Sequence, residues 1–296
     1  MHIDDDDLPT GRVLTRREAV RLLALSGGAL VAGCGRMNSD GAGATAGAAG
    51  GETAGATAQS AAPALPRCVA KPELTVGPYF VDTRLERSDI RVEPGTNEVK
   101  EGARLQLTFN VQQIAGGACT PLAGAMVDVW QCDALGAYSA VDDQIVGFDT
   151  QAQRFLRGYQ VTDAQGRASL TTIYPGWYQG RAVHIHFKIR NPASGVLAND
   201  GNVYEFTSQL FFDETLTDRV HAQQPYAAKG ERDRHNESDG IFRQSGGVLV
   251  LDTTSVPGGY EAVFDVGLDL SDAAVGRADA MERGGPGGPP PGGQRP

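Results

Sequence analysis

Apolar and polar residues alternate with a period of two through the middle of the chain. The run Arg104–Val111 (RLQLTFNV) is the clearest example, since every second residue is apolar. Such alternation predicts a β-strand with one face in a core and the other face toward polar surroundings. Further strands are predicted at residues 125–130, 168–173, 183–189, 205–212, 248–252 and 260–268.

Short strands separated by Gly, Pro and Asp turns, with little amphipathic helical periodicity, indicate an all-β fold. We predict an antiparallel β-sandwich of the Greek-key, immunoglobulin or prealbumin-like kind, with a hairpin turn at Asp163–Gly166. Long loops are expected to carry the functional site. His221 and His235 fall in the polar segment Thr217–Gly240, so we expect both to be solvated loop residues.

The N-terminal residues 1–34 predict an export signal. Arg16 and Arg17 precede an apolar run, Leu22–Ala32, which is too short to span a bilayer and ends in small residues. The following Gly33-Cys34 completes a sequence that resembles a bacterial lipoprotein box, so we expect acylation of Cys34. A leader cleaved nearby without a lipid is the alternative. The protein is therefore expected to be periplasmic or extracellular, with membrane contact only through a lipid on Cys34.

Composition divides the rest of the chain into three parts. Residues 35–66 are mostly Gly, Ala, Thr and Ser, which bury too little apolar surface to fold, so we expect a disordered tether. Residues 67–270 hold the predicted strands and form the folded domain, and residues 271–296 are expected to be a disordered Gly- and Pro-rich tail. The formal net charge of −10 argues against a nucleic-acid partner, because binding nucleic acid requires a basic face.

The cysteines fit an oxidising compartment. If Cys34 is acylated, Cys68, Cys119 and Cys132 remain, and one disulfide with one free thiol is the simplest arrangement. Cys119 and Cys132 bracket an extended segment that holds them apart, so we expect Cys68 to pair with one of them. Metal binding by these cysteines is less favoured, because none lies in a close Cys pair.

Two histidines in one predicted strand indicate a metal site. In the run Arg181–Ile189 (RAVHIHFKI), the apolar residues can face the core while His184 and His186 point together to the other side. Tyr138 and Tyr178, in loops after other strands, can add phenolic oxygens. The histidine pair alone is also compatible with zinc or copper, or with two satisfied polar residues on a half-exposed face.

Six segments together carry a more specific signal. They are Gly77–Phe80 (GPYF), Val127–Ser139 (VDVWQCDALGAYS), Phe155–Asp163 (FLRGYQVTD), Thr172–Tyr178 (TIYPGWY), Gly180–Phe187 (GRAVHIHF) and Ser208–Phe212 (SQLFF). Their order resembles the intradiol ring-cleavage dioxygenases, the family of catechol 1,2-dioxygenases and protocatechuate 3,4-dioxygenases. The resemblance extends from Cys68 to about Leu268.

The resemblance implies a ligand set for a non-haem ferric ion. Its members are Tyr138, Tyr178, His184 and His186. Two anionic phenolate oxygens beside two neutral imidazoles favour Fe(III), whereas two histidines with one carboxylate suit the Fe(II) oxygenases. Tyr178 is implied to be an axial-type ligand that leaves the iron and acts as a base.

The resemblance also implies roles for residues around the iron. Arg181 is expected to stabilise negative charge that develops on the aromatic ring, and Gln209 is expected near the iron. Pro78, Tyr79 and Trp177 are expected to wall the pocket. A surface salt bridge for Arg181 and an ordinary strand hydrogen bond for Gln209 are the alternatives.

The implied reaction is intradiol cleavage of a catechol-type diol by O2 to a cis,cis-muconate-type dicarboxylate. Only five residues separate Tyr178 from His184, fewer than in the cytoplasmic protocatechuate enzymes, and no helical segment is predicted before the sandwich, so the chain resembles the exported branch. The alternative is a secreted transthyretin-like β-sandwich binding module without a catalytic metal, because Pro121–Val129 is also similar to such modules.

Overall fold

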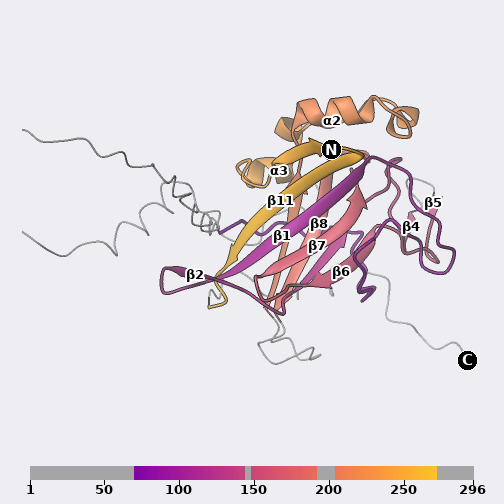
Figure 1. Cartoon of the computed structure of the whole chain (residues 1–296). Helices are drawn as coiled ribbons and strands as arrows, with labels where there is room; N and C mark the ends of the chain where they lie inside the picture. Colours follow the sequence, from indigo (N-terminus) through magenta and orange to yellow (C-terminus); the bar gives the residue numbers. More distant parts are fainter. Residues whose placement is uncertain (1–69, 144–147, 192–203, 272–296) are drawn as a thin grey trace, which may run out of the picture. The chain divides into compact units, whose positions relative to one another are not determined.

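The computed structural model describes residues 70–143, 148–191 and 204–271. Within these ranges the chain is mostly β, with two larger sheets and one two-stranded sheet, β4 (Asp142–Asp143) with β5 (Phe148–Asp149) (Figure 1). The expected all-β class is confirmed. The sandwich and Greek-key details stay predictions.

The first larger sheet is built around β1 (Arg104–Ala115). On one side β1 pairs antiparallel with β7 (Arg167–Ile173) and with β2 (Ala118–Pro121). On its other side β1 runs parallel to β11 (Gly259–Leu268), which pairs antiparallel with β10 (Thr253–Val256) (Figure 1). The sheet is therefore mixed, and the prediction of a purely antiparallel fold was wrong for this pair. The alternation of apolar and polar residues within a strand predicts which face is buried. It does not predict whether a strand from a distant part of the sequence pairs parallel or antiparallel with it.

The second larger sheet is antiparallel throughout. Its strands lie in the order β6 (Arg157–Val161), β3 (Met126–Trp130), β8 (His184–Asn191) and β9 (Tyr204–Phe211). The two larger sheets contribute to one core: Phe109 of β1 and Phe264 of β11 lie with ring centroids 5.2 Å and 5.4 Å from that of Phe187 in β8. This shared core fixes the buried face of β8.

Two strand-level predictions need correction. The segment Val248–Asp252 forms only an isolated bridge between Val250 and Phe211, because Gly246 and Gly247 adopt positive φ and turn the chain just before it. The turn Asp163–Gly166 exists, but it joins β6 to β7, which belong to different larger sheets, so it does not close a hairpin within one sheet.

Helices occupy much of the segment that the sequence predicted as a polar loop. They are α2 (Glu214–His221), η3 (Tyr226–Lys229), η4 (Asn236–Ser238) and α3 (Gly240–Gln244). His221 is buried, bonds the Pro175 carbonyl through Nε2 at 3.0 Å and stacks on Tyr226, so the expectation of a solvated residue was wrong. A helix of only two turns carries too few repeats for its periodicity to be recognised. His235 is exposed over 56% of its side chain, as expected.

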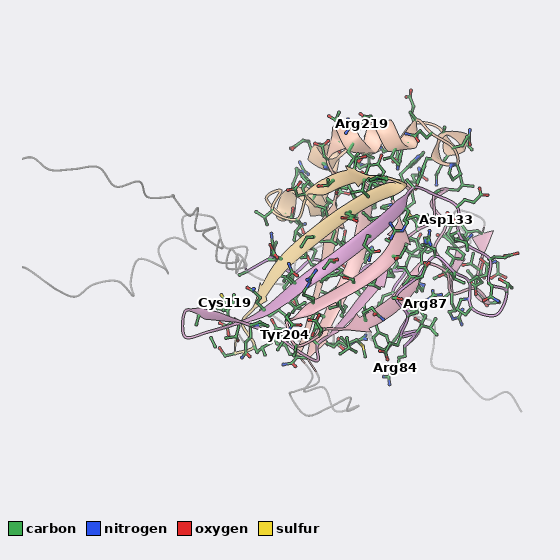
Figure 2. All side chains as sticks on the ribbon, viewed as in Figure 1. Arg84, Arg87, Cys119, Asp133, Tyr204 and Arg219 are labelled. Atoms are coloured by element: carbon green, nitrogen blue, oxygen red, sulfur yellow. The ribbon has the colours of Figure 1, made fainter. Side chains whose placement is uncertain are left out.

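Cys119 lies in the β1–β2 hairpin and is disulfide-bonded, while Cys132 is a buried free thiol (Figure 2). Cys68, the expected partner, lies outside the described residues, as do the export signal, Cys34, the tether and nearly all of the C-terminal tail. In the described part of the chain, no helix has the length and apolar character needed to cross a membrane.

Candidate metal centre

The strand β8 places two imidazoles on the same side. Its residues Ile185, Phe187 and Ile189 belong to the main hydrophobic core, and His184 and His186 alternate with them. Every side chain of β8 except that of Arg190 is buried, so both faces of the strand are covered, and the two histidines are 2% and 1% exposed. The alternation in the sequence of β8 thus places two buried imidazoles on the same side of the strand.

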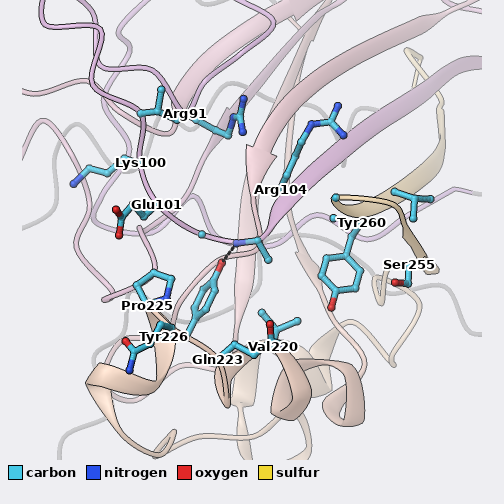
Figure 3. A pocket seen from close by; sticks show the side chains of 17 residues that line it. Arg91, Lys100, Glu101, Arg104, Val220, Gln223, Pro225, Tyr226, Ser255 and Tyr260 are labelled. Atoms are coloured by element: carbon cyan, nitrogen blue, oxygen red, sulfur yellow. Dashed lines mark hydrogen bonds between the residues drawn. The ribbon is translucent and has the colours of Figure 1, made fainter.

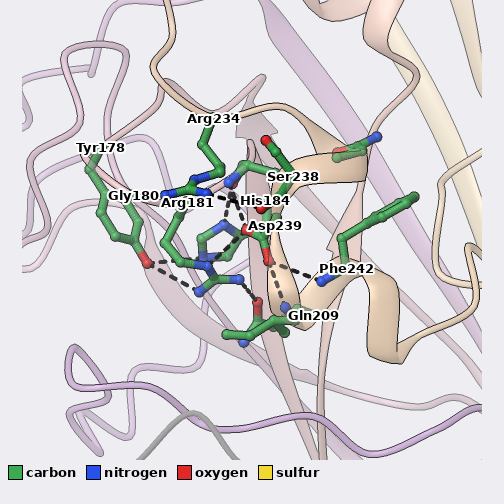
Figure 4. Close-up of polar contacts among 12 residues, drawn as sticks. Tyr178, Gly180, Arg181, His184, Gln209, Arg234, Ser238, Asp239 and Phe242 are labelled. Atoms are coloured by element: carbon green, nitrogen blue, oxygen red, sulfur yellow. Dashed lines mark hydrogen bonds and ion pairs between the residues drawn. The ribbon is translucent and has the colours of Figure 1, made fainter. Parts of the chain in front are cut away.

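The structure brings four aromatic side chains with donor atoms together. The Nε2 atoms of His184 and His186 are 3.0 Å apart, and the Tyr178 hydroxyl lies 3.2 Å from Nε2 of His184 (Figure 4). The ring of Tyr138 has its centroid 5.6 Å from that of Tyr178 and 6.3 Å from that of His186. The two histidines come from β8 and the two tyrosines from loops after β3 and β7, and the four side chains meet in one region.

The hydrogen bonds of His184 prepare it as a ligand. Its Nδ1 lies 2.6 Å from the Ala182 carbonyl, which can only accept, so Nδ1 carries the proton and Nε2 keeps its lone pair. Burial, followed by the charge of Arg181, lowers the pKa of His184 to about 3. Burial and then His184 lower the pKa of His186 well below its ordinary value. Both imidazoles are therefore neutral at ordinary pH.

Of the two tyrosines, Tyr138 is fully buried and Tyr178 is half-buried. The Tyr138 hydroxyl has no hydrogen-bond partner among the described residues, which is costly for a buried polar atom unless another group meets it. Burial raises the pKa of Tyr178 to about 12, against the opposing charge of Arg181. Burial, then Tyr178, raises the pKa of Tyr138 well above its ordinary value. In the absence of a cation both phenols keep their protons.

The donor atoms of His184, His186 and Tyr178 are close enough to bind a single metal ion, and the ring of Tyr138 lies beside them. Bonds of about 2.1 Å from imidazole to a first-row metal ion place two ligands at right angles about 3.0 Å apart, and the two Nε2 atoms have that separation. Oxygen and imidazole donors suit iron better than metals that prefer thiolates. Over the described ranges no cluster of three or more His, Cys, Asp or Glu side chains could hold a metal, so a site on this histidine pair needs the tyrosines.

A hydrogen-bonded network borders the two histidines. Arg181 donates from Nη2 to Gln209 Oε1 at 2.6 Å and from Nη1 toward the Tyr178 hydroxyl at 3.5 Å (Figure 4). Gln209 lies opposite His186 in the β8–β9 register and donates to the Thr75 carbonyl at 2.9 Å. Asp239 accepts from Arg181 Nε at 3.0 Å. Asp239 was not predicted from the sequence. Its one local signal is its position as an N-cap residue before a helical turn.

The predicted pocket-wall residues occupy different places. Tyr79 stacks on Tyr138 with ring centroids 4.4 Å apart and donates to Asp143 Oδ2 at 2.6 Å. Trp177 contacts Lys229, whose ammonium lies 4.7 Å from its ring centroid, and donates to the Gly230 carbonyl. Pro78 is exposed. Tyr79 is thus the wall residue whose ring packs against two of the four donors, Tyr138 and Tyr178.

A separate pocket of about 840 Å³ lies elsewhere, where the start of β1 meets the β10–β11 turn and residues 223–226 (Figure 3). Arg104, Tyr226 and Tyr260 line it, and its lining includes none of the predicted site residues. The Tyr226 hydroxyl is already used, because it accepts from Ala103 N and donates to the Tyr174 carbonyl.

Gly77 packs directly against one of the histidines. The imidazole of His186 stacks on Trp130, with centroids 5.0 Å apart and planes 8° apart. Gly77 has a φ of 72°, and a Cβ at this position would lie 3.1 Å from Cε1 of His186. The glycine is therefore required both by the backbone conformation and by the close approach of the imidazole.

Comparisons with known proteins agree on one family. The family model described as Dioxygenase matches residues 75–218. A chlorocatechol 1,2-dioxygenase of Pseudomonas sp. (strain P51) is 34% identical over 111 residues, which cover 31% of this chain and 38% of that protein. A chlorocatechol 1,2-dioxygenase of Pseudomonas putida is 29% identical over 128 residues, covering 33% and 47%. The alignments thus span less than half the length of these curated relatives.

A solved structure matches over a larger share. The structure of an intradiol ring-cleavage dioxygenase from Tetranychus urticae superposes with a TM-score of 0.59 at 31% sequence identity. The match covers 72% of this chain and 98% of that chain. The similarities in sequence and in fold are therefore both to dioxygenases, in agreement with the donor atoms found in the candidate site.

Replacing Gly77 by Ala tests the packing of His186. We expect Gly77→Ala to reduce the ferric ion retained after dialysis by about 10-fold, the scale of losses from altered outer-shell support. Gly95→Ala is the matched control, because Gly95 also has a positive φ of 95° but has no atom within 4 Å of the added Cβ. Both variants carry a backbone strain of about 1–2 kcal/mol. Equal iron retention in the two variants would contradict the prediction.

Proposed function

This chain belongs to the intradiol ring-cleavage dioxygenase family, and we propose that it uses a non-haem ferric ion to cleave a catechol-type diol with O2. The product is a cis,cis-muconate-type dicarboxylate, and both oxygen atoms of O2 enter it. The observation that carries the proposal is the convergence of Tyr138, Tyr178, His184 and His186 in one buried region. A metal-free transthyretin-like module is not favoured, because it has no use for four converging donors.

The donor set decides the choice of metal. Two phenolic oxygens, once deprotonated, together with two neutral imidazoles favour Fe(III) over zinc or copper, which the histidine pair alone would leave open. When bound, the ferric ion supplies Lewis acidity and a template that holds the two oxygens of a catechol. The protein contributes the fixed positions of the four ligands and a dry surrounding.

Tyr178 is suited to accept a proton from the substrate. Its hydroxyl lies 3.2 Å from Nε2 of His184 and 3.5 Å from Nη1 of Arg181. The oxygen is therefore close both to the proposed metal site and to the guanidinium of Arg181. Burial raises the pKa of Tyr178 to about 12, so its phenolate would bind a proton strongly. Tyr178 therefore combines the roles of ligand and base.

Arg181 is suited to stabilise negative charge on the substrate. Its guanidinium is buried beside the phenol of Tyr178, and its side chain is 14% exposed. A fixed cation in a site with little water acts on developing charge with little screening. Gln209 accepts from Arg181 Nη2 and so limits the rotation of the guanidinium plane.

The location is part of the proposal. We propose that the chain is exported by its twin-arginine signal and held at a membrane by a lipid on Cys34. The support comes from the sequence of residues 1–34, which lie outside the described residues. A folded protein carried by this route could receive its metal before export.

Removing one phenol tests the metal site. We expect Tyr138→Phe to lower ferric ion affinity by more than about 10-fold. Loss of a residue that only supports a ligand typically costs at least about 10-fold in metal affinity, and loss of the ligand itself should cost more. The visible band of a tyrosinate bound to Fe(III) should weaken in parallel. Tyr260→Phe on β11 removes a phenol outside the candidate site and should keep both signals. A wild-type protein that stays colourless after ferric reconstitution would overturn the proposed function and favour a metal-free module.

Removing the guanidinium tests the charge on Arg181. Arg181→Ala should keep the iron and its colour but reduce kcat by about 10²–10³-fold, the range for loss of one electrostatic stabiliser. The readouts are O2 uptake and ultraviolet absorbance of a muconate from catechol. Arg243→Ala, an exposed arginine of α3, should keep full turnover. Unchanged turnover in Arg181→Ala would remove this residue from the mechanism.

The anchor can be tested on the full chain in a bacterial host with lipoprotein processing. We expect the mature protein to begin at an acylated Cys34 by mass spectrometry and to enter a detergent phase. Cys34→Ser should leave it in the aqueous phase. Recovery of the wild-type protein without a lipid would favour the simple leader.

A further inference from the structure

Asp239 uses both oxygens of its carboxylate in two different tasks. The residue precedes α3 as its N-cap and is 2% exposed. Its Oδ1 accepts from the backbone N–H groups of Ile241 at 2.8 Å and Phe242 at 3.0 Å. Its Oδ2 accepts from Arg181 Nε at 3.0 Å and from Ala182 N at 2.8 Å (Figure 4). One carboxylate therefore ties α3 to the segment that leads into β8.

The contact with Arg181 fixes the direction of the guanidinium. Its Nε points to Asp239, its Nη2 to Gln209 and its Nη1 toward Tyr178. Among the described side chains, Asp239 is the carboxylate in ion-pair contact with Arg181. A planar fork held at Nε by a charged acceptor and at Nη2 by an amide oxygen keeps one orientation.

The contact with Ala182 reaches one of the metal-site histidines. Asp239 holds the backbone N–H of Ala182, and the carbonyl of the same residue lies 2.6 Å from Nδ1 of His184. That carbonyl selects the tautomer that leaves Nε2 free to bind a metal. The single carboxylate thus acts on the cation and on one ligand of the site.

The charge of Asp239 is itself secured by these contacts. Burial alone would raise its pKa, but Arg181 and the backbone N–H groups of Ala182 and Phe242 outweigh that effect and lower it. The carboxylate is therefore ionised at ordinary pH. Removing it would leave the buried Arg181 without its charged partner.

We propose that Asp239 is a positioning residue that orients Arg181 toward the substrate and fixes the segment that presents His184. The role rests on the proposed function, because Arg181 and His184 act on a catechol only if the site holds iron. A purely structural helix cap would not need the carboxylate charge, since Asn caps helices about as well as Asp. The ion pair with Arg181 therefore distinguishes a positioning residue from a residue that only caps α3.

The matched pair of variants is Asp239→Asn and Asp213→Asn. Asp213 is the N-cap of α2 and accepts from Leu216 N at 2.8 Å, but it is exposed and makes no contact with Arg181 among the described residues. Both substitutions preserve size and an oxygen that can cap a helix. Only Asp239→Asn turns an amide donor or a neutral oxygen toward Arg181 Nε and Ala182 N.

The first readout uses metal-free protein and no substrate. In nuclear magnetic resonance spectra the Nε–H of Arg181, assigned by its loss in Arg181→Lys, should exchange slowly with water in the wild type and in Asp213→Asn. We expect its protection to fall by at least about 10-fold in Asp239→Asn. Equal protection in Asp239→Asn would overturn the proposal. Asp239→Ser, which also caps helices but has a single shorter oxygen, replaces the Asn variant if that protein does not fold.

The second readout uses the iron-loaded enzyme. Asp239→Asn should lower kcat by about 10–100-fold, as expected when support for a site is lost, with a smaller change in KM. In the Arg181→Ala background the same substitution should lower kcat much less, because the guanidinium that Asp239 orients is already gone and only the contact with Ala182 remains to be lost. An equal loss in both backgrounds would show a general effect on the fold and would overturn the proposal.

The two proposals fail in different ways. A wild-type protein that does not bind iron would overturn the proposed function, whatever the resonance of Arg181 shows. An active, coloured wild type in which Asp239→Asn behaves like Asp213→Asn in both readouts would overturn the role of Asp239 alone.

Discussion

The burial of two imidazoles on one strand is the constraint on which the site depends. A strand covered on both faces normally carries apolar residues on both, yet β8 alternates Ile185 and Phe187 with His184 and His186. Burial keeps the imidazoles neutral, and their position on the same side of β8 places their Nε2 atoms 3.0 Å apart. Such an arrangement is costly for a chain alone, because buried nitrogen atoms need partners. Under the proposed function, a bound cation would share these lone pairs and offset the cost.

The strands β3 and β9, on either side of β8, hold the side chains around His186 in place. In the register of the second sheet, Trp130 of β3 and Gln209 of β9 lie on either side of His186. Trp130 stacks on the imidazole, and Gln209 bonds the guanidinium of Arg181. The packed core of the two sheets fixes these strands and with them the two histidines, whereas Tyr138 and Tyr178 lie in loops that follow β3 and β7. Site residues on strands are held more accurately than residues on loops.

Sequence alternation could predict part of this arrangement, because it is a local property. The period of two in residues 183–189 predicts which side each histidine takes, and the core side of β8 agrees. The parallel pairing of β1 with β11 joins residues more than 150 positions apart, and no local pattern encodes its direction. His221 was misread because its helix is short and its neighbours are polar. Asp239 was missed because its partner Arg181 lies 58 residues earlier.

The polar groups of the site divide into two kinds, and the division is informative. Both oxygens of Asp239 and both ends of the Gln209 amide are bonded within the chain. The Tyr138 hydroxyl, in contrast, is buried without a partner among the described residues. The unsatisfied hydroxyl thus belongs to a side chain to which the proposed function assigns a bond to the metal. Under the proposed function, a ferric ion would bind this oxygen and supply the charge that the two phenols require to lose their protons.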